Sequence, residues 1–569
     1  MSQREREPGY EFCICHLEDR GKDAEKFWSE INKIFEDSEN EKIDFRGFFF
    51  VPQKGEPKFN FSDKTFSKKV YFRGATFSKH VDFSHVTFSD YTDFSSVIFC
   101  ENVNFRNCKF SESANFNSVV FSGISDFRGC EFSKGANFSG TIFSGKSNFQ
   151  NTVFSKKVYF RGATFFEKIY FHRAIFSRKA YFQDSVFFKL VYFRDTTFSK
   201  KISLHGALFL GGCNFRDATF LEDAYFKKTV FSKKASFNNN KFSKDAHFDG
   251  TEFGGDASFR DVEFGGDANF RRVTFSKNAV FSASVFKGKA RFQRSNFHSC
   301  EFRGAEFKEV YFKDAVFVNE LDFFGVFIES YGKFINTVFS SGANIGGCDF
   351  GEPVKISFNR VNLSKTSFKN TDLSKINFEN CTWAKIDKGF ISIQRILGEE
   401  NRRFGLYDEF KLREEKKEGK KPISDDYSFI ETLNRQLKYN YEEKRNYPDA
   451  GEFYISEMEM RRLNPDTPTS KKVILTPYKV LGLYGEAIAR PIFWFTTLIL
   501  FSTFEFHHIG DSNMIWVESF KTALRFAYLR PDFGTTKTFL EVLLGLFTSV
   551  IGVTLIALTV IGIKRQVRR

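Results

Sequence analysis

The sequence lacks the residue groupings that usually indicate catalysis. No nucleophile with a partner base, no acid–base pair and no phosphate-binding loop stands out from the rest of the chain. Met and Trp are also scarce, with 4 residues each, whereas 81 of the 569 residues are Phe. This usage is far from that of ordinary globular proteins. We therefore expect a protein that is not an enzyme and needs no cofactor, and we look for its function in the arrangement of the Phe residues.

Cysteines are few and follow no pattern. The nine cysteines are an odd number, and the charged start MSQREREPGYEF has no secretory leader, which together predict a reducing compartment. Cys13, Cys15 and His16 lie close enough to share a metal ion. Because a zinc site normally needs four ligands and no fourth is evident nearby, we predict no metal site, and structural use of these residues is the simpler alternative.

An acidic excess is absent as well. The formal net charge is +14, and 41% of the residues are hydrophobic. The hydrophobic fraction is ample for a large core. The positive charge is compatible with an anionic partner such as lipid headgroups or nucleic acid, but it does not choose between them.

A regular ladder of Phe residues is the dominant feature that is present. Phe66, Phe72, Phe77, Phe83 and Phe88 follow one another by alternating steps of six and five. An eleven-residue period can indicate a right-handed coiled coil. However, such steps rotate a helix by about 240° and 140° in turn, so the Phe residues would not share a face. The pattern instead predicts a solenoid of short extended segments with Phe inside.

The repeat resembles the pentapeptide-repeat family. In that family a central Leu or Phe has a small residue two positions before it and Asp or Asn one position before it. Ala75 lies two positions before Phe77, and Asn104 lies one position before Phe105. The resemblance implies a mainly β protein, a right-handed quadrilateral β-helix over residues 59–384. Here six-residue steps alternate with five, which implies 22 residues per coil. Residues 1–58 would form a separate N-terminal segment. Between Asp23 and Glu36 it has apolar residues at helical spacing, which predict a helix that caps the open end of the solenoid.

Basic side chains recur at positions 22 apart, so they should form rows on the outside of the solenoid. Like charges so close repel unless they are neutralised, and a row could serve as a track for anions. The alternative is a solvated face balanced by neighbours such as Glu131, Asp195 and Asp223. The residues of the predicted anion-binding surface are Arg106, Arg128, Lys134, Lys156, Arg178, Arg194, Lys200 and Arg216.

A charged linker and a helical hairpin are predicted for residues 385–470. The stretch Glu399 to Lys421 reads as a solvated helix or linker. Two amphipathic segments then follow, broken near Asn446 and Pro448. They resemble a tetratricopeptide-like hairpin, and also the segment that joins pentapeptide repeats to a membrane module in a group of prokaryotic proteins. The hairpin could serve simple packing or dock a protein.

Residues 471–569 are predicted to form a membrane module with two transmembrane helices, about 488–506 and 539–563. Basic residues before the first span and after the second exceed those of the loop between them. This bias places both ends of the chain, and the repeat rod, on the cytoplasmic side of the plasma membrane.

A short amphipathic segment lies between the two predicted spans. The order of a span, a short helix and a second span resembles a potassium-channel subunit. Where such a subunit has its selectivity-filter sequence, residues 528–533 of this chain are Tyr-Leu-Arg-Pro-Asp-Phe. Arg530 would oppose cation passage, so an interfacial helix is the preferred interpretation. The pore-like residues of this segment are Trp516, Phe520, Leu524, Arg530 and Asp532.

The sequence thus predicts a membrane-anchored interaction scaffold whose cytoplasmic rod is presented to an unknown protein partner. The alternative is an atypical two-helix ion-channel-like protein in which the rod acts as a sensor. Integral membrane attachment is expected in both cases. Anionic lipid and homo-oligomerisation are compatible with the sequence, whereas nucleic acid is disfavoured as a partner.

Overall fold

The computed structural model describes residues 14–18, 21–36, 41–53, 55–56, 58–351, 355–388, 402–509, 515–529 and 538–567. The chain forms two compact units. The first comprises Met1–Val361 with Phe378–Asn380, and the second comprises Asn362–Asn377 with Cys381–Arg569. The last repeats therefore belong to the unit that holds the C-terminal helices.

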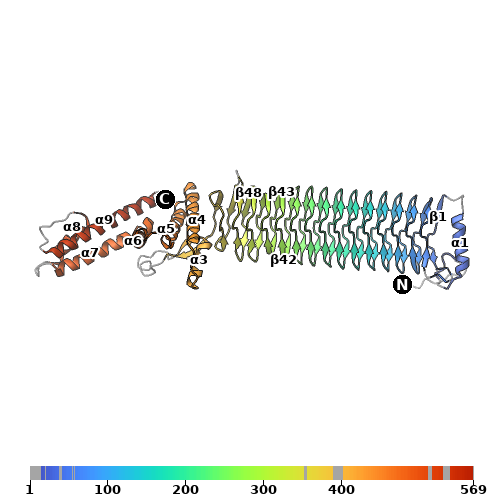
Figure 1. Cartoon of the computed structure of the whole chain (residues 1–569), viewed down its shortest axis with the longest axis horizontal. Coiled ribbons are helices and arrows are strands. Elements are labelled where there is room, and N and C mark those ends of the chain that lie inside the picture. Colours follow the sequence, from blue (N-terminus) through green and yellow to red (C-terminus); the bar gives the residue numbers. More distant parts are fainter. Residues whose placement is uncertain are drawn as a thin grey trace, which may run out of the picture. The chain divides into compact units, whose positions relative to one another are not determined.

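In most of the first unit each turn contains four short strands. One turn consists of β20 (Val153–Phe154), β21 (Val158–Tyr159), β22 (Thr164–Phe165) and β23 (Ile169–Tyr170). The next turn begins with β24 (Ile175–Phe176), which pairs in parallel with β20 so that residues 22 apart lie side by side. The strands form two 27-stranded sheets in about 14 turns, which Figure 1 shows as a continuous stack. The predicted mainly β solenoid is confirmed.

Phe side chains fill the interior as stacked columns. The rings of Phe127 and Phe149 are parallel within 1° with centroids 4.7 Å apart, and Phe149 continues the column to Phe171 at 5.1 Å. Within a turn, Phe149 meets Phe160 edge to face at 5.6 Å. Stacked rings match the strand spacing of about 4.8 Å, and edge-to-face contacts are the other favoured aromatic geometry. This fit explains why the core is made almost entirely of Phe.

Tight turns at alternate corners explain the polar and glycine positions of the repeat. The amide of Ala163 donates to the carbonyl of Phe160 at 3.1 Å, and Gly162 between them has φ of 61°. A left-handed residue at this place of a turn favours Gly, Asn or Asp. Where Asn precedes a Phe, its side chain also contributes: that of Asn148 accepts the amide of Gln150 at 3.0 Å.

A second ladder, of buried hydroxyl and thiol groups, runs beside these turns. The hydroxyl of Thr152 donates to the carbonyl of Phe127 in the preceding turn at 2.7 Å, and the thiol of Cys130 donates to Phe105 at 2.9 Å. Burial raises the pKa of the Cys130 thiol well above its usual value, so that the thiol stays protonated. The small residues of the repeat therefore bond one turn to the next.

The period shortens near the C-terminal end of the first unit. The strands there are longer, because the two short strands on either side of a corner join into one. The register of strand pairing shifts between Phe275 and Asn278 in one strand, and between Phe286 and Lys289 in the next. The long strands are β42 (Thr274–Val280), β43 (Val285–Arg291), β44 (Asn296–Glu301) and β45 (Glu306–Tyr311). The same change is visible in the sequence, where Phe residues follow one another by steps of five from Phe297 to Phe317.

Helix α1 (Ala24–Glu36) precedes the first strands, and β1 (Lys42–Asp44) follows it. The carboxylate of Asp23 accepts two amides of the first helical turn, at 3.1 and 3.2 Å, which is a favourable start for a helix. Phe27 is buried, and its ring lies 5.6 Å from that of Phe50 in the first turn of the solenoid.

In the second unit the final repeats are followed by a small hairpin of strands and by helices. These elements are β53 (Thr366–Ser367), β55 (Ala384–Asp387), β56 (Arg402–Gly405), α3 (Tyr407–Lys417), α4 (Ser424–Glu443) and α5 (Tyr447–Leu463). The strands β55 and β56 are antiparallel. Asn446 caps α5 and Pro448 lies in its first turn, which explains the break between the two helices.

Side chains of α3 and α4 satisfy the backbone of these final repeats. The carboxylate of Asp408 accepts the amide of Phe368 at 3.0 Å, and the side chain of Gln436 accepts the amide of Leu373 at 3.0 Å. Two further hydrogen bonds join Asn440 to the Ile376 carbonyl and the Trp383 indole to the Tyr441 hydroxyl. Because an open sheet end leaves backbone groups unpaired, these contacts close the end of the repeat series.

The remaining helices are α6 (Thr469–Gly482), the short η1 (Leu483–Gly485), α7 (Ala489–Ile509), α8 (Trp516–Ala527) and α9 (Phe539–Val567). Within the described part of the chain, one segment, Phe539–Arg565 in α9, is long and apolar enough to cross a membrane. The structure thus gives one candidate span, whereas the sequence predicts two. Helix α7 covers the predicted first span but does not reach the same apolarity.

Candidate functional site

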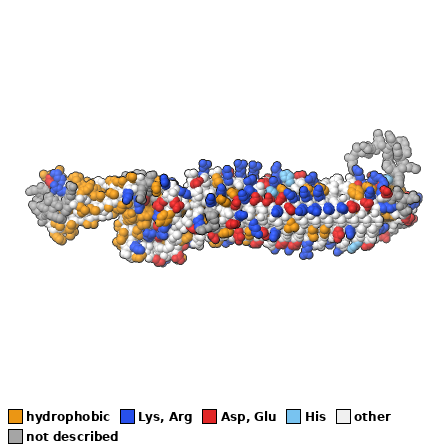
Figure 2. All heavy atoms as spheres, turned by 90° about the horizontal axis from the view of Figure 1, so that it is seen from above, with side chains coloured by type: hydrophobic (Ala, Val, Ile, Leu, Met, Phe, Trp, Pro, Cys, Tyr) orange, Lys and Arg blue, Asp and Glu red, His pale blue; other side chains and the backbone are white. Residues whose placement is uncertain are grey.

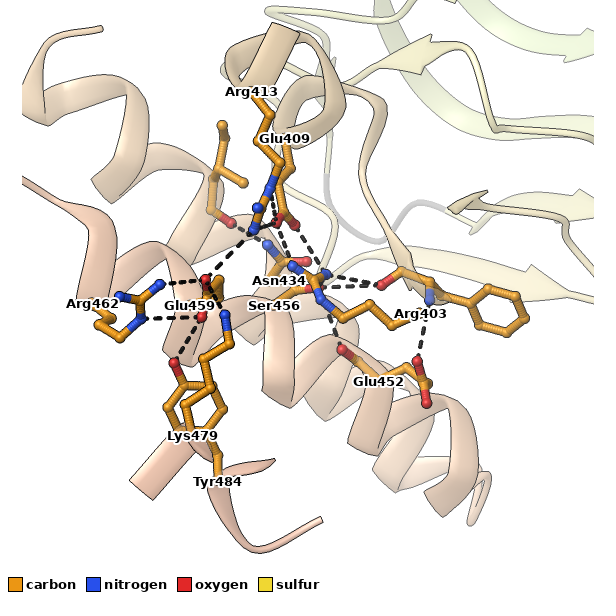
Figure 3. Close-up of polar contacts among 12 residues, drawn as sticks. Arg403, Glu409, Arg413, Asn434, Glu452, Ser456, Glu459, Arg462, Lys479 and Tyr484 are labelled. Carbon is orange, nitrogen blue, oxygen red and sulfur yellow. Dashed lines mark hydrogen bonds and ion pairs between the residues drawn. The ribbon is translucent and has the colours of Figure 1, made fainter. Parts of the chain in front are cut away.

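Glu459 of α5 is the centre of a buried ionic cluster that joins four elements of the second unit (Figure 3). Its side chain is 4% exposed. It accepts hydrogen bonds from Lys479 of α6 at 2.9 Å and from the Tyr484 hydroxyl of η1 at 2.8 Å. Arg462 of the same helix binds it at 2.7 Å, and Arg413 of α3 lies 3.9 Å away. One carboxylate thus holds segments that are far apart in sequence.

A second buried carboxylate, Glu409 of α3, continues the cluster. It is fully buried and forms ion pairs with Arg403 of β56 and with Arg413, the latter at 2.8 Å. Arg403 is itself 1% exposed and also donates to the hydroxyl of Ser456 in α5. Because a buried charge is costly unless it is paired and hydrogen-bonded, the close pairing explains how both groups remain inside.

The protonation states of the cluster are strongly fixed. Burial alone would raise the pKa of Glu459, but hydrogen bonds from Arg462 and the charge of Lys479 outweigh it and hold this pKa well below its usual value. Burial and the adjacent Glu459 raise the pKa of Tyr484 far above its usual value. Burial lowers the pKa of Lys479 in spite of Glu459. The arrangement favours a permanent link over a group that exchanges protons near neutral pH.

The link holds an unusual reversal of the backbone between α6 and α7. Leu483, Tyr484 and Gly485 have φ of 48°, 59° and 81°, so three successive residues are left-handed. Non-glycine residues adopt this conformation only where their surroundings impose it. Here Glu459 binds the Tyr484 side chain, while Arg565 near the end of α9 donates to the Tyr484 carbonyl at 3.1 Å.

Arg565 also binds the carboxylate of Glu486 at 2.6 Å and lies 4.6 Å from the centroid of the Tyr454 ring in α5. The segment before α7 and the end of α9 are therefore tied to the hairpin helix by one set of contacts. A change in α5 would be felt at the ends of both helices. We name the set formed by Glu409, Arg413, Glu459, Lys479, Tyr484 and Arg565 the junction.

Sequence reasoning missed the junction. The stretch containing Glu409 was expected to be solvated, yet Glu409 and Leu412 are buried in α3. A signal was present in α5, where Glu457 and Glu459 alternate with Met458 and Met460, and the structure buries all four. Acidic residues that alternate with buried apolar residues indicate buried partners.

The structure places the predicted anion-binding residues on the outside of the first unit. Rows of Lys and Arg run along the repeat turns in Figure 2. Four of the predicted residues take part in ion pairs: Arg128 with Asp126, Arg194 with Asp195 and Asp217, Lys200 with Glu222, and Arg216 with Asp217. Within the described residues, no ion pair involves Arg106, Lys134, Lys156 or Arg178. The rows are thus neutralised in part.

The structure describes three of the five predicted pore-like residues, all of them in α8. Helix α8 packs on α7 and α9, and Ser519, Thr522, Ala523, Phe526 and Ala527 are its buried side chains. Trp516 and Phe520 are exposed and Leu524 is half-buried, so the two largest of these predicted side chains do not lie on the packed side. Arg530 and Asp532 lie outside the described residues.

Small residues allow the close approach of α8 to α9. A Cβ added to Gly552 would lie 2.6 Å from the carbonyl oxygen of Ala527, and the hydroxyl of Ser549 donates to the Phe526 carbonyl at 2.8 Å. The ring of Phe526 stacks on Phe506 of α7 at 5.7 Å. Backbone contact of this kind is typical of helices packed in membranes.

The N-terminal Cys and His residues are separated in their environments. Cys15 is buried, whereas the ring of His16 is exposed, lies 3.1 Å from the Arg46 carbonyl and meets Phe48 edge to face. Cys13 lies outside the described residues. Among the residues that the structure describes, no group of three or more metal-ligating side chains is close enough to hold a metal ion.

Comparison with known families agrees with the repeat geometry. A family model described as pentapeptide repeats (9 copies) matches residues 94–142, 138–186, 149–197, 193–239 and 237–285, and a second, pentapeptide repeats (8 copies), matches 354–382. These segments are pentapeptide repeats. No family match supports the channel-like module expected after the pentapeptide-repeat solenoid. No curated protein and no solved structure matches the chain.

Proposed function

We propose that the protein is a membrane-anchored interaction scaffold without enzymatic activity. The observation that carries this proposal is helix α9, in which Phe539–Arg565 is long and apolar enough to span a bilayer. Its side chains Leu543, Leu546 and Val550 are 55%, 52% and 67% exposed, which would be unfavourable in water. A lipid environment removes this cost.

Helix α7 is the proposed second span. It has 21 residues, enough for a hydrocarbon core of about 30 Å. Leu500, Phe501 and Phe504 are 62%, 51% and 49% exposed, and Arg490 at its start is buried. With both helices inserted, the solenoid and the end of α9 would lie on the cytoplasmic side of the cell membrane, as the distribution of basic residues suggests.

The solenoid would supply the repetitive surface that an unidentified protein partner binds. Helix α1 is proposed to cap its first turn, because the buried Phe27 covers rings that would otherwise face water. The right-handed course expected from the pentapeptide-repeat resemblance belongs to the same proposal. The junction supports a role in transmission, since it ties the hairpin to the segment before α7 and to the end of α9.

Alkaline carbonate extraction of membranes tests the anchor. The full chain should remain in the membrane pellet, and Leu543→Arg with Val550→Arg on the exposed side of α9 should release it. Ile142→Arg on an exposed position of the solenoid is the matched control and should have no effect. Release of the unaltered chain by carbonate would refute the anchor.

An ion-channel-like protein is the second candidate, favoured by the close packing of α8 against α7 and α9. A short helix held between two spans is the arrangement that a pore would need. Conductance of the purified full chain in planar bilayers under several ions decides this alternative. Silence in all ions would exclude it and leave the scaffold.

A further inference from the structure

An apolar ladder lies on one outer corner of the solenoid. Phe166, Phe188 and Leu210 each follow an inward-pointing Phe and occupy the same position in three successive turns. Their side chains are 43%, 40% and 38% exposed, and the rings of Phe166 and Phe188 stack at 4.8 Å. Leu190, two positions after Phe188, is 38% exposed. We name these four residues the corner ladder.

The corner ladder is not needed by the fold. The turns on either side have Ser144 and Ser232 at the same position and keep the same pairing. The interior columns are complete without it, because Phe165, Phe187 and Phe209 already fill the core. A contiguous apolar group on the outside of an otherwise polar corner indicates a surface that is covered by something else.

Lysines share this corner with the ladder. Glu167 is the one acidic residue at the corner in the five turns from 144 to 234. The lysines are Lys146, Lys168, Lys189, Lys233 and Lys234, and all five are exposed. Within the described part of the chain none of them forms an ion pair, although the Lys146 ammonium lies 4.8 Å from the centroid of the Tyr170 ring. The corner therefore combines apolar side chains with unneutralised positive charge.

We propose that the corner ladder docks on the surface of an anionic bilayer, with Phe166, Phe188, Leu190 and Leu210 inserted among the lipid headgroups. The proposal rests on the membrane attachment proposed above. Apolar and aromatic side chains that enter the headgroup region, together with lysines that attract anionic lipid, are the two contributions that bind a surface to a membrane.

A bilayer fits this corner better than nucleic acid does. The corner that carries Lys156, Arg178 and Lys200 has Ser155, Ser177 and Ser199 where the ladder has Phe and Leu. In these three turns that corner offers charge alone, which any polyanion satisfies. Four exposed apolar side chains gain nothing from a phosphate backbone but are favourable at the boundary of hydrocarbon and headgroups.

Tryptophan substitution in the full chain tests the contact. Phe188→Trp places a fluorescent side chain in the ladder. Leu221→Trp places one at a position of similar exposure, 43%, on the corner that carries Lys200. Both variants, and the unaltered chain for subtraction, are reconstituted in vesicles of phosphatidylcholine or of equal parts phosphatidylcholine and phosphatidylglycerol, each with brominated acyl chains. Circular dichroism confirms that the variants fold.

The expected result is a loss of the Phe188→Trp fluorescence in the anionic vesicles, absent for Leu221→Trp. Adding Lys168→Glu and Lys189→Glu should abolish that loss, and high salt should reduce it by screening. Equal fluorescence of Phe188→Trp in both kinds of vesicle would overturn the proposal.

Carbonate extraction of the same vesicles separates this proposal from the anchor. A chain that resists extraction but shows no quenching at position 188 retains the anchor and loses the docking surface. A chain that is extracted but is quenched at position 188 before extraction loses the anchor and retains the docking surface.

Discussion

At the residue scale, Glu459 has the most far-reaching contacts in the second unit. Its two carboxylate oxygens receive Lys479, Tyr484 and Arg462. Four cations surround the two carboxylates Glu409 and Glu459, and the excess charge is tolerated because Arg413 and Arg462 remain 27% and 21% exposed to water. The cluster is therefore stable only while both carboxylates are ionised.

Replacing Glu459 should disrupt this arrangement. Glu459→Gln leaves Lys479 and Arg462 without a buried counter-charge, which typically costs about 3 to 5 kcal/mol. We expect a corresponding fall in the free energy of unfolding of the C-terminal helices, measured by denaturant titration in detergent. Glu418→Gln, at a side chain that is 65% exposed, is the control and should change little. Equal stability of the two variants would contradict the role assigned to Glu459.

Acid should weaken the same contacts. The folded-state pKa of Glu459 lies below the unfolded value of 4.5, so its stabilising contribution is present above pH 4.5 and is lost as the pH falls below it. Asp408 acts in the opposite direction, because burial raises its pKa and protonation then favours the folded state. The melting temperature of the helices should fall below pH 4.5, and this fall should be smaller in Glu459→Gln. An identical pH profile in both proteins would refute the assignment.

Single residues also show what sequence could reveal. The inward Phe residues and the left-handed turn position at Gly162 follow from the repeat, because one local pattern is imposed many times. Glu459 and Arg403 have no such repetition. Their burial also depends on distant partners, Ser456 for Arg403 and Lys479 for Glu459; the alternation of Glu and Met in α5 indicates that buried partners exist but not which residues they are.

At the scale of elements, the packing of α8 on α9 depends on the absence of side chains. The contact of Gly552 with Ala527 involves backbone atoms, which cannot move aside as the end of a flexible side chain can. The amphipathic pattern of α8 predicted a helix but not its packed side, since among apolar helices small residues such as Ser519 and Ala523 can be buried while Trp516 stays outside.

A larger residue at Gly552 should separate the two helices. Gly552→Val forces a contact shorter than side chains normally make, and overpacking typically costs about 1 to 3 kcal/mol. We expect faster hydrogen exchange of the α8 amides and a lower melting temperature in detergent. Thr554→Val, at an exposed position of the same helix, should leave both unchanged. Unchanged exchange in Gly552→Val would show that the helices are not in contact.

At the scale of the whole molecule, the net charge of +14 is spread over rows that differ in their neutralisation. Lys200 is paired with Glu222 at 3.1 Å, whereas the exposed Lys156 and Arg178 form no ion pair within the described residues. The sequence predicted the rows because positions 22 apart must stack, but it could not assign the pairs, which depend on how neighbouring side chains lie.

Binding to a polyanion should distinguish these groups. Lys156→Gln with Arg178→Gln should lower the salt concentration at which the full chain elutes from immobilised heparin, because unpaired cations contribute to counterion release. Lys200→Gln with Glu222→Gln removes a pair without changing the net charge and should elute like the unaltered chain. Coincident elution of all three proteins would favour a merely solvated face.

Because the solenoid has a constant register, its length can change by whole turns. Because residues 22 apart pair along most of the stack, removal of one complete turn, such as 155–176, would shorten the protein by one strand spacing and leave every outer row continuous. Removal of 22 residues between 275 and 317, where the turns are shorter, would instead align side chains that belong to different outer rows. The distance between the two ends of this surface can therefore change in evolution by fixed steps, without loss of whatever pattern of contacts the surface presents.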